Sequence, residues 1–401
     1  MTGRPPRITR IRVLASLGLL LLAVVPLACD GDGDSGGGSD TMTTAVAIVD
    51  LNGDGQADIA ATSLVATGPP PHEGFVSLFL QNSAVKAGSF LRAGQPAVGS
   101  DPWFIGSGDL NADGLPDLVV ANQTASSISV LFQRPGSPGS FLAAQYLGTG
   151  SHPNGVAIGR VNGDALPDVA VADLGVSLFL QDPSAPGTFL ARRSLGLGSA
   201  ASVAIGDLNA DGVADLVVVG GGKVQVLLQE SAAPGTYEPP VQLTAGLAPF
   251  FVAIRDLNAD GAPDMVVANQ ASNTVSVFLQ DGTTPGTFLP PTNLPVDRSP
   301  VMVAIGDLNG DGTPDLAVAN QGSNPDGVIS VLLQDPSRPG QFLPATNYVA
   351  GSQPSSVAIG DLNADGVADL AAAVGDGVAM LLQNPSQPGT FGSPRLLEIT
   401  R

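Results

Sequence analysis

The chain has 401 residues and is strongly acidic, with 36 Asp plus Glu against 16 Lys plus Arg and a formal net charge of −20. It carries no basic stripe that could neutralise phosphates, which excludes nucleic acid as the expected partner. Gly (51) and Pro (34) are abundant, and this is typical of many short elements joined by tight turns.

Residues 1–28 have the pattern of an export signal peptide. Four arginines between Arg4 and Arg12 precede an apolar stretch, residues 13–28, that is short for a membrane span. Cys29, the only cysteine, follows directly and resembles the acylated residue of bacterial lipoproteins, although Pro26 stands where such signals usually carry Leu. The alternative is ordinary cleavage near Ala28 with an incidental thiol. Intrachain disulfides are excluded in either case.

Residues 29–42 are rich in Asp, Gly and Ser and cannot bury much apolar surface. We therefore expect a flexible tether here and one folded domain over residues 43–401. The protein is expected to cross the inner membrane and to reside at the cell envelope, as a lipoprotein, or outside the cell.

The folded region is built from seven copies of one unit. Residues 203–216 read VAIGDLNADGVADL, and residues 357–370 are identical. Related copies have loops that start at Asp50, Asp109, Asp256 and Asp307, and a degenerate copy has its loop start at Arg160. Internal repeats of this length indicate a solenoid, an array or a propeller.

Each copy predicts four β-strands. Three apolar runs rich in Val and Leu are followed by a Pro/Gly turn that ends in an aromatic residue, and then by a more polar fourth run. Four strands in about 50 residues, seven times over, predict an all-β fold, a seven-bladed β-propeller of four-stranded antiparallel blades. Residues 395–400 supply the last outer strand. The sequence leaves open how the ring closes.

Between the first two strands of each copy lies a loop with the pattern D-x-N-x-D-G-x-x-D. Side-chain oxygens at positions 1, 3, 5 and 9 and the carbonyl of position 7 are hard ligands, which Ca²⁺ prefers, and Gly at position 6 permits a sharp turn. Mg²⁺ fits less well, and zinc is disfavoured because no His or Cys lies in any loop. About six calcium sites are expected, and their candidate ligands are Asp50, Asn52, Asp54, Gln56 and Asp58; Asp109, Asn111, Asp113, Leu115 and Asp117; Asp207, Asn209, Asp211, Val213 and Asp215; Asp256, Asn258, Asp260, Ala262 and Asp264; Asp307, Asn309, Asp311, Thr313 and Asp315; and Asp361, Asn363, Asp365, Val367 and Asp369.

Charge repulsion supports a bound cation. Carboxylates within about 5 Å of one another repel by roughly 3 kcal/mol per pair at an effective dielectric constant of about 20. The loops differ from EF-hands, because their flanks are predicted strands and because position 12 is Val120 or Val218 in place of Glu.

The third copy departs from the pattern at two positions. Arg160 occupies position 1 and Ala165 occupies position 6. We expect this blade to be metal-free, with the Arg160 guanidinium paired to Asp164 or Asp168 in the place of a metal.

With these motifs, residues 43–401 resemble the FG-GAP-like (VCBS-type) repeat family. The resemblance implies a propeller similar to that of integrin α chains, in which calcium loops of this type are structural and the propeller binds ligands. The expected function is a non-catalytic, calcium-stabilised binding or adhesion module, a monomer whose partner is a protein or polysaccharide at the cell surface. The alternatives are a structural envelope scaffold, a lectin or a polysaccharide-acting enzyme. The only histidines, His72 and His152, are expected to be solvated loop residues.

Overall fold

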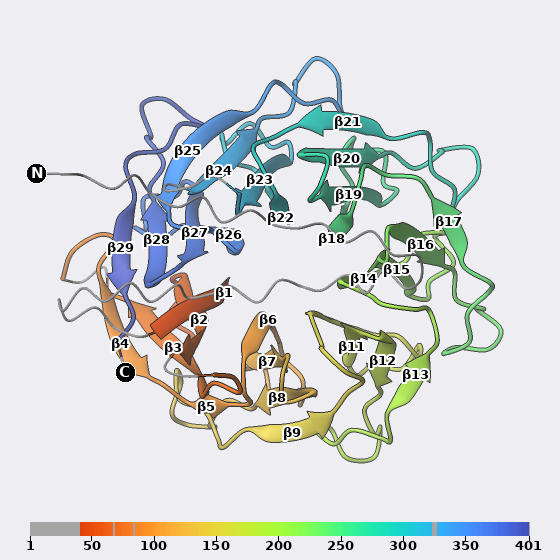
Figure 1. The fold of residues 1–401 in the computed structure, drawn as a ribbon, viewed down its shortest axis with the longest axis horizontal. Coiled ribbons are helices and arrows are strands. Elements are labelled where there is room, and N and C mark those ends of the chain that lie inside the picture. The colour runs from red at the N-terminus through yellow and green to blue at the C-terminus, as the bar shows by residue number, and fades with distance from the viewer. Residues whose placement is uncertain (1–40, 67–68, 83–84, 323–326, 401) are drawn as a thin grey trace, which may run out of the picture. The chain divides into compact units, whose positions relative to one another are not determined.

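The computed structural model describes residues 41–66, 69–82, 85–322 and 327–400, and it confirms the predicted β-propeller. Seven antiparallel sheets are arranged around a central axis (Figure 1). None of the described residues forms a helix long and apolar enough to cross a membrane. The expected signal peptide, Cys29 and most of the expected tether lie outside these residues. Thr41 and Met42, placed in the tether by the sequence, belong to the first strand.

Each blade is formed by consecutive strands, numbered from the axis outward. The blades are β1 (Thr41–Val49), β2 (Asp58–Val65), β3 (Gly74–Gln81) and β4 (Phe90–Gly94), with β5 (Ala97–Val98) pairing with β3; β6 (Pro102–Gly108), β7 (Asp117–Asn122), β8 (Ser127–Leu131) and β9 (Gln145–Gly148); β10 (Gly155–Gly159), β11 (Asp168–Asp173), β12 (Gly175–Phe179) and β13 (Arg193–Leu195); β14 (Ser202–Gly206), β15 (Asp215–Gly220), β16 (Lys223–Leu227) and β17 (Val241–Leu243); β18 (Pro249–Arg255), β19 (Asp264–Asn269), β20 (Thr274–Phe278) and β21 (Thr292–Pro295); β22 (Pro300–Gly306), β23 (Asp315–Asn320), β24 (Gly327–Leu332) and β25 (Thr346–Gly351); and β26 (Ser356–Gly360), β27 (Asp369–Val374), β28 (Gly377–Leu381) and β29 (Arg395–Glu398).

The hydrophobic core lies between neighbouring blades. One cluster packs Ala170 and Val176 of the third blade against Val203 and Val218 of the fourth, and equivalent clusters join the other blade pairs. The second and third strands are buried on both faces, as in β7 and β8, because each sheet is covered on both sides by neighbours. The outer strands are mostly exposed, as the polar fourth run of each repeat predicts.

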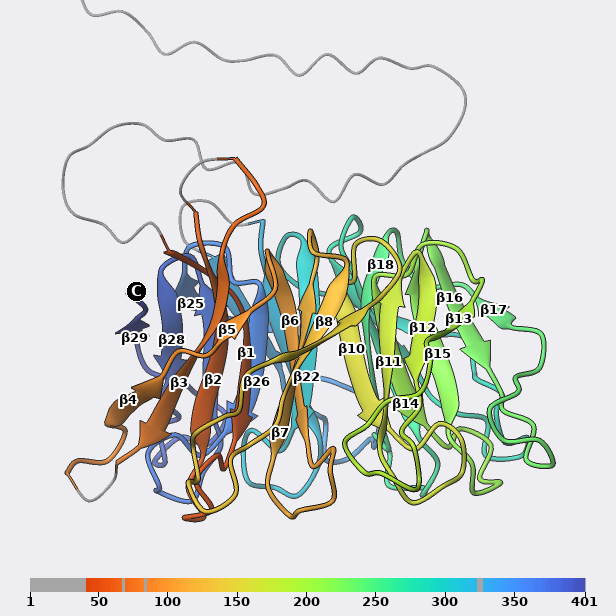
Figure 2. The ribbon, with the colours of Figure 1, turned by 90° about the horizontal axis from the view of Figure 1, so that it is seen from below.

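The strands run between two faces of the ring (Figure 2). At one face, here called the loop face, lie the aspartate loops and the Pro/Gly turns. At the other, here called the mouth face, the inner strands begin and the second and third strands are joined. The alternating direction of the antiparallel strands places every aspartate loop on the loop face.

The ring closes by packing, without exchange of a strand between the first and last repeats. Each four-stranded sheet comes from a single repeat, and β1 of the first blade lies against β26 and β27 of the last. The Thr43 amide donates to the Gly375 carbonyl at 3.0 Å, and the Ser355 hydroxyl donates to the Thr44 carbonyl at 2.8 Å. Buried apolar side chains of both blades, including Phe75 and Met380, complete this interface.

Glycines at the ends of the inner strands set how closely the blades approach. A Cβ atom on Gly159 would lie 2.9 Å from Cγ2 of Ile205 in the next blade, and one on Gly360 would lie 2.7 Å from Cγ2 of Ile48. The first blade has Val49 at this position, and the next blade has Ser107 where the others carry Ile. At this first interface a larger residue on one blade thus coincides with a smaller residue on its neighbour, whereas the fifth blade has Arg255 at the glycine position and the sixth blade keeps Ile305.

We predict that Gly360→Ala destabilises the ring at its closure. The added methyl group overlaps Ile48, and overpacking of this kind typically costs about 1–3 kcal/mol. The measurement is the urea unfolding midpoint of the full chain. Gly148→Ala is the matched control, because a Cβ atom at Gly148 meets nothing within 4 Å. Equal midpoints for the two variants would contradict the close approach.

Candidate metal-binding loops

The seven loops join the inner strand of each blade to the second strand. Position 9 of the loop is the first residue of the second strand in every blade, as Asp58 is in β2 and Asp215 is in β15. The loop is therefore held at both ends by the same β-ladder, in which Gly206 pairs with Asp215.

Two positions in the intact loops have left-handed backbone conformations. At position 6 the six glycines have φ between +82° and +87°, which confirms the predicted sharp turn and requires glycine. Position 4 is also left-handed, and there either Gly or Ala is found, as in Gly53 and Ala210 with φ of +73° and +57°. The sequence analysis did not identify position 4, although its restriction to Gly and Ala in the seven loops was a usable signal.

The side chains at positions 1, 3 and 5 organise the loop backbone. In the fourth loop, Asp207 Oδ2 accepts a hydrogen bond from the Gly212 amide at 2.9 Å, and Asn209 Oδ1 accepts one from the Asp211 amide at 3.1 Å. Asp211 Oδ1 accepts one from the Val213 amide at 3.0 Å. The same three bonds recur in the other intact loops, so these residues curl the chain around a small region.

The position 9 carboxylate is buried and bonded to two backbone amides. Asp215 is fully buried, with Oδ2 accepting from the Leu208 amide at 2.8 Å and Oδ1 accepting from the Gln229 amide at 2.6 Å. This aspartate thus ties the start of its loop to the end of the third strand. The same pair of bonds is present in all seven blades.

Burial raises the pKa of these position 9 carboxyls. The pKa rises from 3.8 to about 6, first because burial disfavours the charged form and then because of repulsion by neighbouring loop aspartates, while the two backbone bonds lower it. This holds for Asp58, Asp117, Asp168, Asp215, Asp315 and Asp369, and the pKa of Asp264 is raised for the same reasons. The negative charges of the aspartates at positions 1 and 5 therefore contribute to the raised pKa of the carboxyl at position 9.

A glutamine missed by the sequence analysis connects each loop to the Pro/Gly turn of its own blade. Gln334 Nε2 donates to the Pro314 carbonyl, at position 8 of the loop, at 2.8 Å, and its Oε1 accepts from the Gly340 amide at 3.1 Å. Equivalent glutamines follow the third strand in the second to seventh blades. The first blade has Gln81 there, and neither polar atom of its buried side-chain amide has a partner among the described residues. The sequence signal that could have identified these residues is the Gln that ends the third apolar run of every repeat.

The turn glycine also contacts the loop of the preceding blade. A Cβ atom on Gly187 would lie 3.2 Å from Cβ of Asn111, and the Gly139 amide donates to the Leu51 carbonyl at 2.8 Å. At the ring closure, Gly88 lies in the same way against Asn363. Position 3 of each intact loop is therefore covered by the next blade. Between the sixth and seventh loops, Asp307 and Asp361 line a hollow of about 310 Å³.

The third loop keeps part of the hydrogen-bond pattern of the intact loops and contradicts one prediction. Asn162, Asp164 and Asp168 keep the bonds of positions 3, 5 and 9, but Ala165 does not adopt the left-handed conformation of the position 6 glycines. Arg160 is exposed, and the ion pairs of the described residues include none between it and Asp164 or Asp168. The expected internal ion pair is thus wrong: Arg160 directly follows the end of β10, and its side chain is exposed to solvent.

The donor chemistry of the intact loops fits a hard divalent cation. Every side-chain donor is a carboxylate or amide oxygen, and the carboxylates are close enough to raise the pKa of the buried one. Within the described part of the chain, no three acidic, His or Cys side chains converge closely enough to form a metal-binding cluster without rearrangement. The reason is visible at position 9, whose two oxygens face backbone amides.

His72 is not the solvated residue that the sequence predicts. Its Nδ1 lies 2.5 Å from Asp101 Oδ1, with side-chain exposures of 18 % and 13 %, so the pair joins the first blade to the connection into the second. His152 is exposed, as expected.

Comparisons with known proteins support the repeat assignment. The FG-GAP-like repeat matches residues 109–171, 161–218, 207–267 and 256–318, and the FG-GAP repeat matches residues 42–79. A crystal structure of a functionally unknown protein from Desulfotomaculum acetoxidans DSM 771 is similar in fold, with a TM-score of 0.53 and 12 % sequence identity over 81 % of this chain and 96 % of that one. A search of curated proteins found no match.

We predict that the buried glutamines differ in their contribution to stability. Gln334→Leu removes partners from a half-buried carbonyl and a buried amide, which typically costs about 1–3 kcal/mol. Gln81→Leu, the matched control, removes two buried polar atoms that have no partner among the described residues and should be neutral or stabilising. Urea unfolding midpoints compare the two. A loss of stability in Gln81→Leu as large as that in Gln334→Leu would refute the role of the glutamine.

We also predict an unusual pH dependence in the presence of a chelator. The folded-state pKa of the position 9 carboxyls lies above the unfolded value of 3.8, so the folded state binds more protons between pH 4 and 6. Stability should therefore rise as the pH falls from 7 to 5. Carboxyls with a lowered pKa, such as Asp335 at about 2, oppose this only below about pH 4. Thermal unfolding in EDTA at pH 7 and pH 5 provides the measurement, and a lower melting temperature at pH 5 would be the contrary result.

Proposed function

Because the chain belongs to the FG-GAP-like repeat family, we propose that it is a calcium-stabilised, non-catalytic binding or adhesion module anchored at the cell envelope. The FG-GAP β-propeller fold fits a binding or adhesion module. The further parts of the proposal concern the ion, the anchor and the ligand, and each has its own support.

The calcium proposal is carried by the six intact loops. Each collects three carboxylates and an amide on one turn of chain, with glycine in the left-handed conformation at position 6. The buried position 9 carboxyl shows the electrostatic cost of this arrangement, because its pKa is raised partly by positions 1 and 5. A divalent ion would offset that repulsion by drawing the oxygens into one coordination shell. The residues that would hold it are the side chains at positions 1, 3, 5 and 9 and the carbonyl of position 7.

The anchor is proposed from the N-terminal sequence. A basic segment, an apolar stretch and Cys29 follow one another as in an acylated exported protein, and the repeats that come after are of a type found in extracellular and cell-surface proteins. We propose that residues 1–28 are removed, that Cys29 carries the lipid, and that the propeller stands outside the inner membrane.

The binding role is favoured by the chemistry of the charged residues. The acidic groups are concentrated in loops, where they bond backbone amides, and His72 is engaged by Asp101. The loop carboxylates are thus engaged in holding the backbone of the loops. A large surface built from seven similar loops instead offers repeated contacts to an extended partner, for which we propose a protein or a polysaccharide at the cell surface.

The calcium stoichiometry provides the first test. The full chain should bind six Ca²⁺ ions, counted by atomic emission after gel filtration, and R160D/A165G should bind seven, because it restores positions 1 and 6 of the third loop. Asp211→Asn should remove one ion and lower the melting temperature in calcium. A count of zero, or a melting temperature unaffected by EDTA, would overturn the calcium proposal.

The ligand is tested with the calcium-loaded full chain. We expect retention on a glycan array or capture of a surface protein that is lost in EDTA, because the loops then lose their order. Release of reducing ends or peptides from the same material would show catalysis and overturn the non-catalytic assignment.

A further inference from the structure

The described chain begins at the mouth face. Thr41 is the first residue of β1, and Thr44, three residues later, lines a hollow at the centre of that face. Eleven residues lie between Cys29 and Thr41, and the twelve steps that they make at 3.3–3.6 Å each span at most about 43 Å. If Cys29 carries the lipid, as proposed above, the mouth face is the one kept close to the bilayer.

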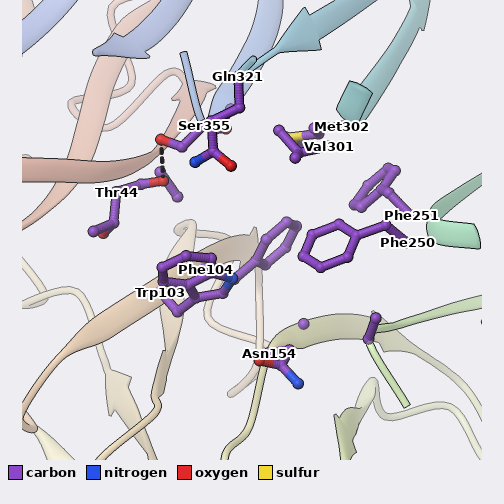
Figure 3. A pocket seen from close by; sticks show the side chains of 14 residues that line it. Thr44, Trp103, Phe104, Asn154, Phe250, Phe251, Val301, Met302, Gln321 and Ser355 are labelled. Carbon is purple, nitrogen blue, oxygen red and sulfur yellow. Dashed lines mark hydrogen bonds between the residues drawn. The ribbon is translucent and has the colours of Figure 1, made fainter. Parts of the chain in front are cut away.

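Aromatic side chains gather on this face around the central hollow. Trp103, Phe104, Phe250 and Phe251 lie together on one side, and Met302 lies nearby (Figure 3). The rings of Phe104 and Phe251 have centroids 6.0 Å apart. The hollow holds only about 30 Å³, room for roughly two water molecules, so it is too small for a ligand, and the aromatic side chains that line it are half-buried.

The cluster arises from departures within the repeats. The inner strands of the second, fifth and sixth blades enter the sheet with a register shift, between Pro102 and Phe104, between Pro249 and Phe251, and between Pro300 and Met302. The inner strands of the third, fourth and seventh blades pair without such a shift. The first blade has a shift of the same kind, between Thr43 and Ala45. The extra residue in these four blades is Thr44, Trp103, Phe250 or Val301, and all four line the hollow.

Two strongly exposed leucines extend the apolar surface on the same face. Leu174, 63 % exposed, lies in the turn between β11 and β12, and Leu247, 69 % exposed, lies in the connection that leads into β18.

The number of charged residues also differs between the two faces. Twenty aspartates lie in the loops of the loop face, whereas among the described residues the strand order places six acidic residues on the mouth face, Glu73, Asp101, Asp173, Asp297, Asp376 and Glu398, with Lys223 and Arg298 among them.

We propose that the mouth face lies on the lipid bilayer that carries the Cys29 anchor, with Trp103, Phe250, Leu174 and Leu247 in contact with the membrane interface. Tryptophan and other amphipathic rings favour the headgroup level, and the exposed leucines gain by leaving water. Contacts too weak to hold a free protein suffice here, because the short connection keeps the face at a high effective concentration near the surface.

This inference rests on the proposed anchor and also determines which face meets the outside. The loop face, with its six candidate calcium sites, points away from the membrane. A ligand on another cell or in the medium would therefore encounter the loop face first.

Trp103 is the only tryptophan, so its fluorescence reports from the mouth face alone. The full, acylated chain is reconstituted on phosphatidylcholine vesicles, with and without lipids brominated on their acyl chains. We expect a shift of the emission to shorter wavelength and quenching by the brominated lipids. L174S/L247S, which alters exposed side chains only, should keep the melting temperature and lose at least half of the quenching.

The matched control moves the reporter to the other face. In W103F/L289W the only indole is in a Pro/Gly turn of the loop face, at a residue that is 47 % exposed, and it should not be quenched. Failure of the chain to sediment with the vesicles would refute the anchor and this inference together. Sedimentation without quenching of Trp103, or with quenching of the control only, would overturn the orientation and leave the anchor standing. In that case the apolar face would be open to a protein partner.

Discussion

The fold depends on one buried carboxylate in each blade. The position 9 aspartate lies at the start of the second strand, where it holds the first amide of its loop and the amide that follows the third strand. A buried charge of this kind is costly unless it is fully hydrogen-bonded, and here both oxygens are used. Because the glutamine whose amide it accepts also reaches the loop carbonyl and the Pro/Gly turn, one aspartate fixes the geometry of the whole loop-face end of the blade.

Contacts between successive blades connect these hydrogen-bonded loops and turns around the ring. The turn fixed by each glutamine packs against position 3 of the preceding loop, and the last such contact, between Gly88 and Asn363, joins the first and last repeats. The first blade differs in its turn, and there Gln81 lacks the partners that its counterparts have among the described residues. Position 9, the glutamine and the turn glycine therefore act as one unit, and its loss in a single blade is tolerated because the interblade apolar packing is retained.

Much of the fold could be predicted from the sequence because the repeats determine it. The residue pattern of each repeat predicted four strands, a polar outer strand and a turn at the position 6 glycine. The structure confirms all three. Ring closure could not be predicted, since it depends on packing between residues more than 300 apart, such as Ile48 and Gly360. The Arg160 ion pair was wrongly predicted because a charge at position 1 says nothing about the direction in which the side chain leaves the strand. The hydrogen-bond partners of the buried glutamines could not be predicted either, because a Gln that recurs at the end of a strand is equally compatible with an exposed side chain.

The two faces of the ring are formed by different parts of each repeat, so the residue types on one face do not determine those on the other. The loop end of each repeat is constrained by the hydrogen-bonded unit around position 9, so its seven copies stay alike and acidic. At the mouth end the only requirement is that the inner strand enters the sheet, and a shift in register there is absorbed by neighbouring blades. Departures can therefore accumulate at the mouth end without loss of the fold, and those that have done so place aromatic residues in one cluster. Phe104, Phe250 and Phe251 also pack against the interblade core from the mouth end, so these rings contribute to the packing of the ring. The position of the cluster beside the start of β1 is the observation on which the proposed membrane orientation rests.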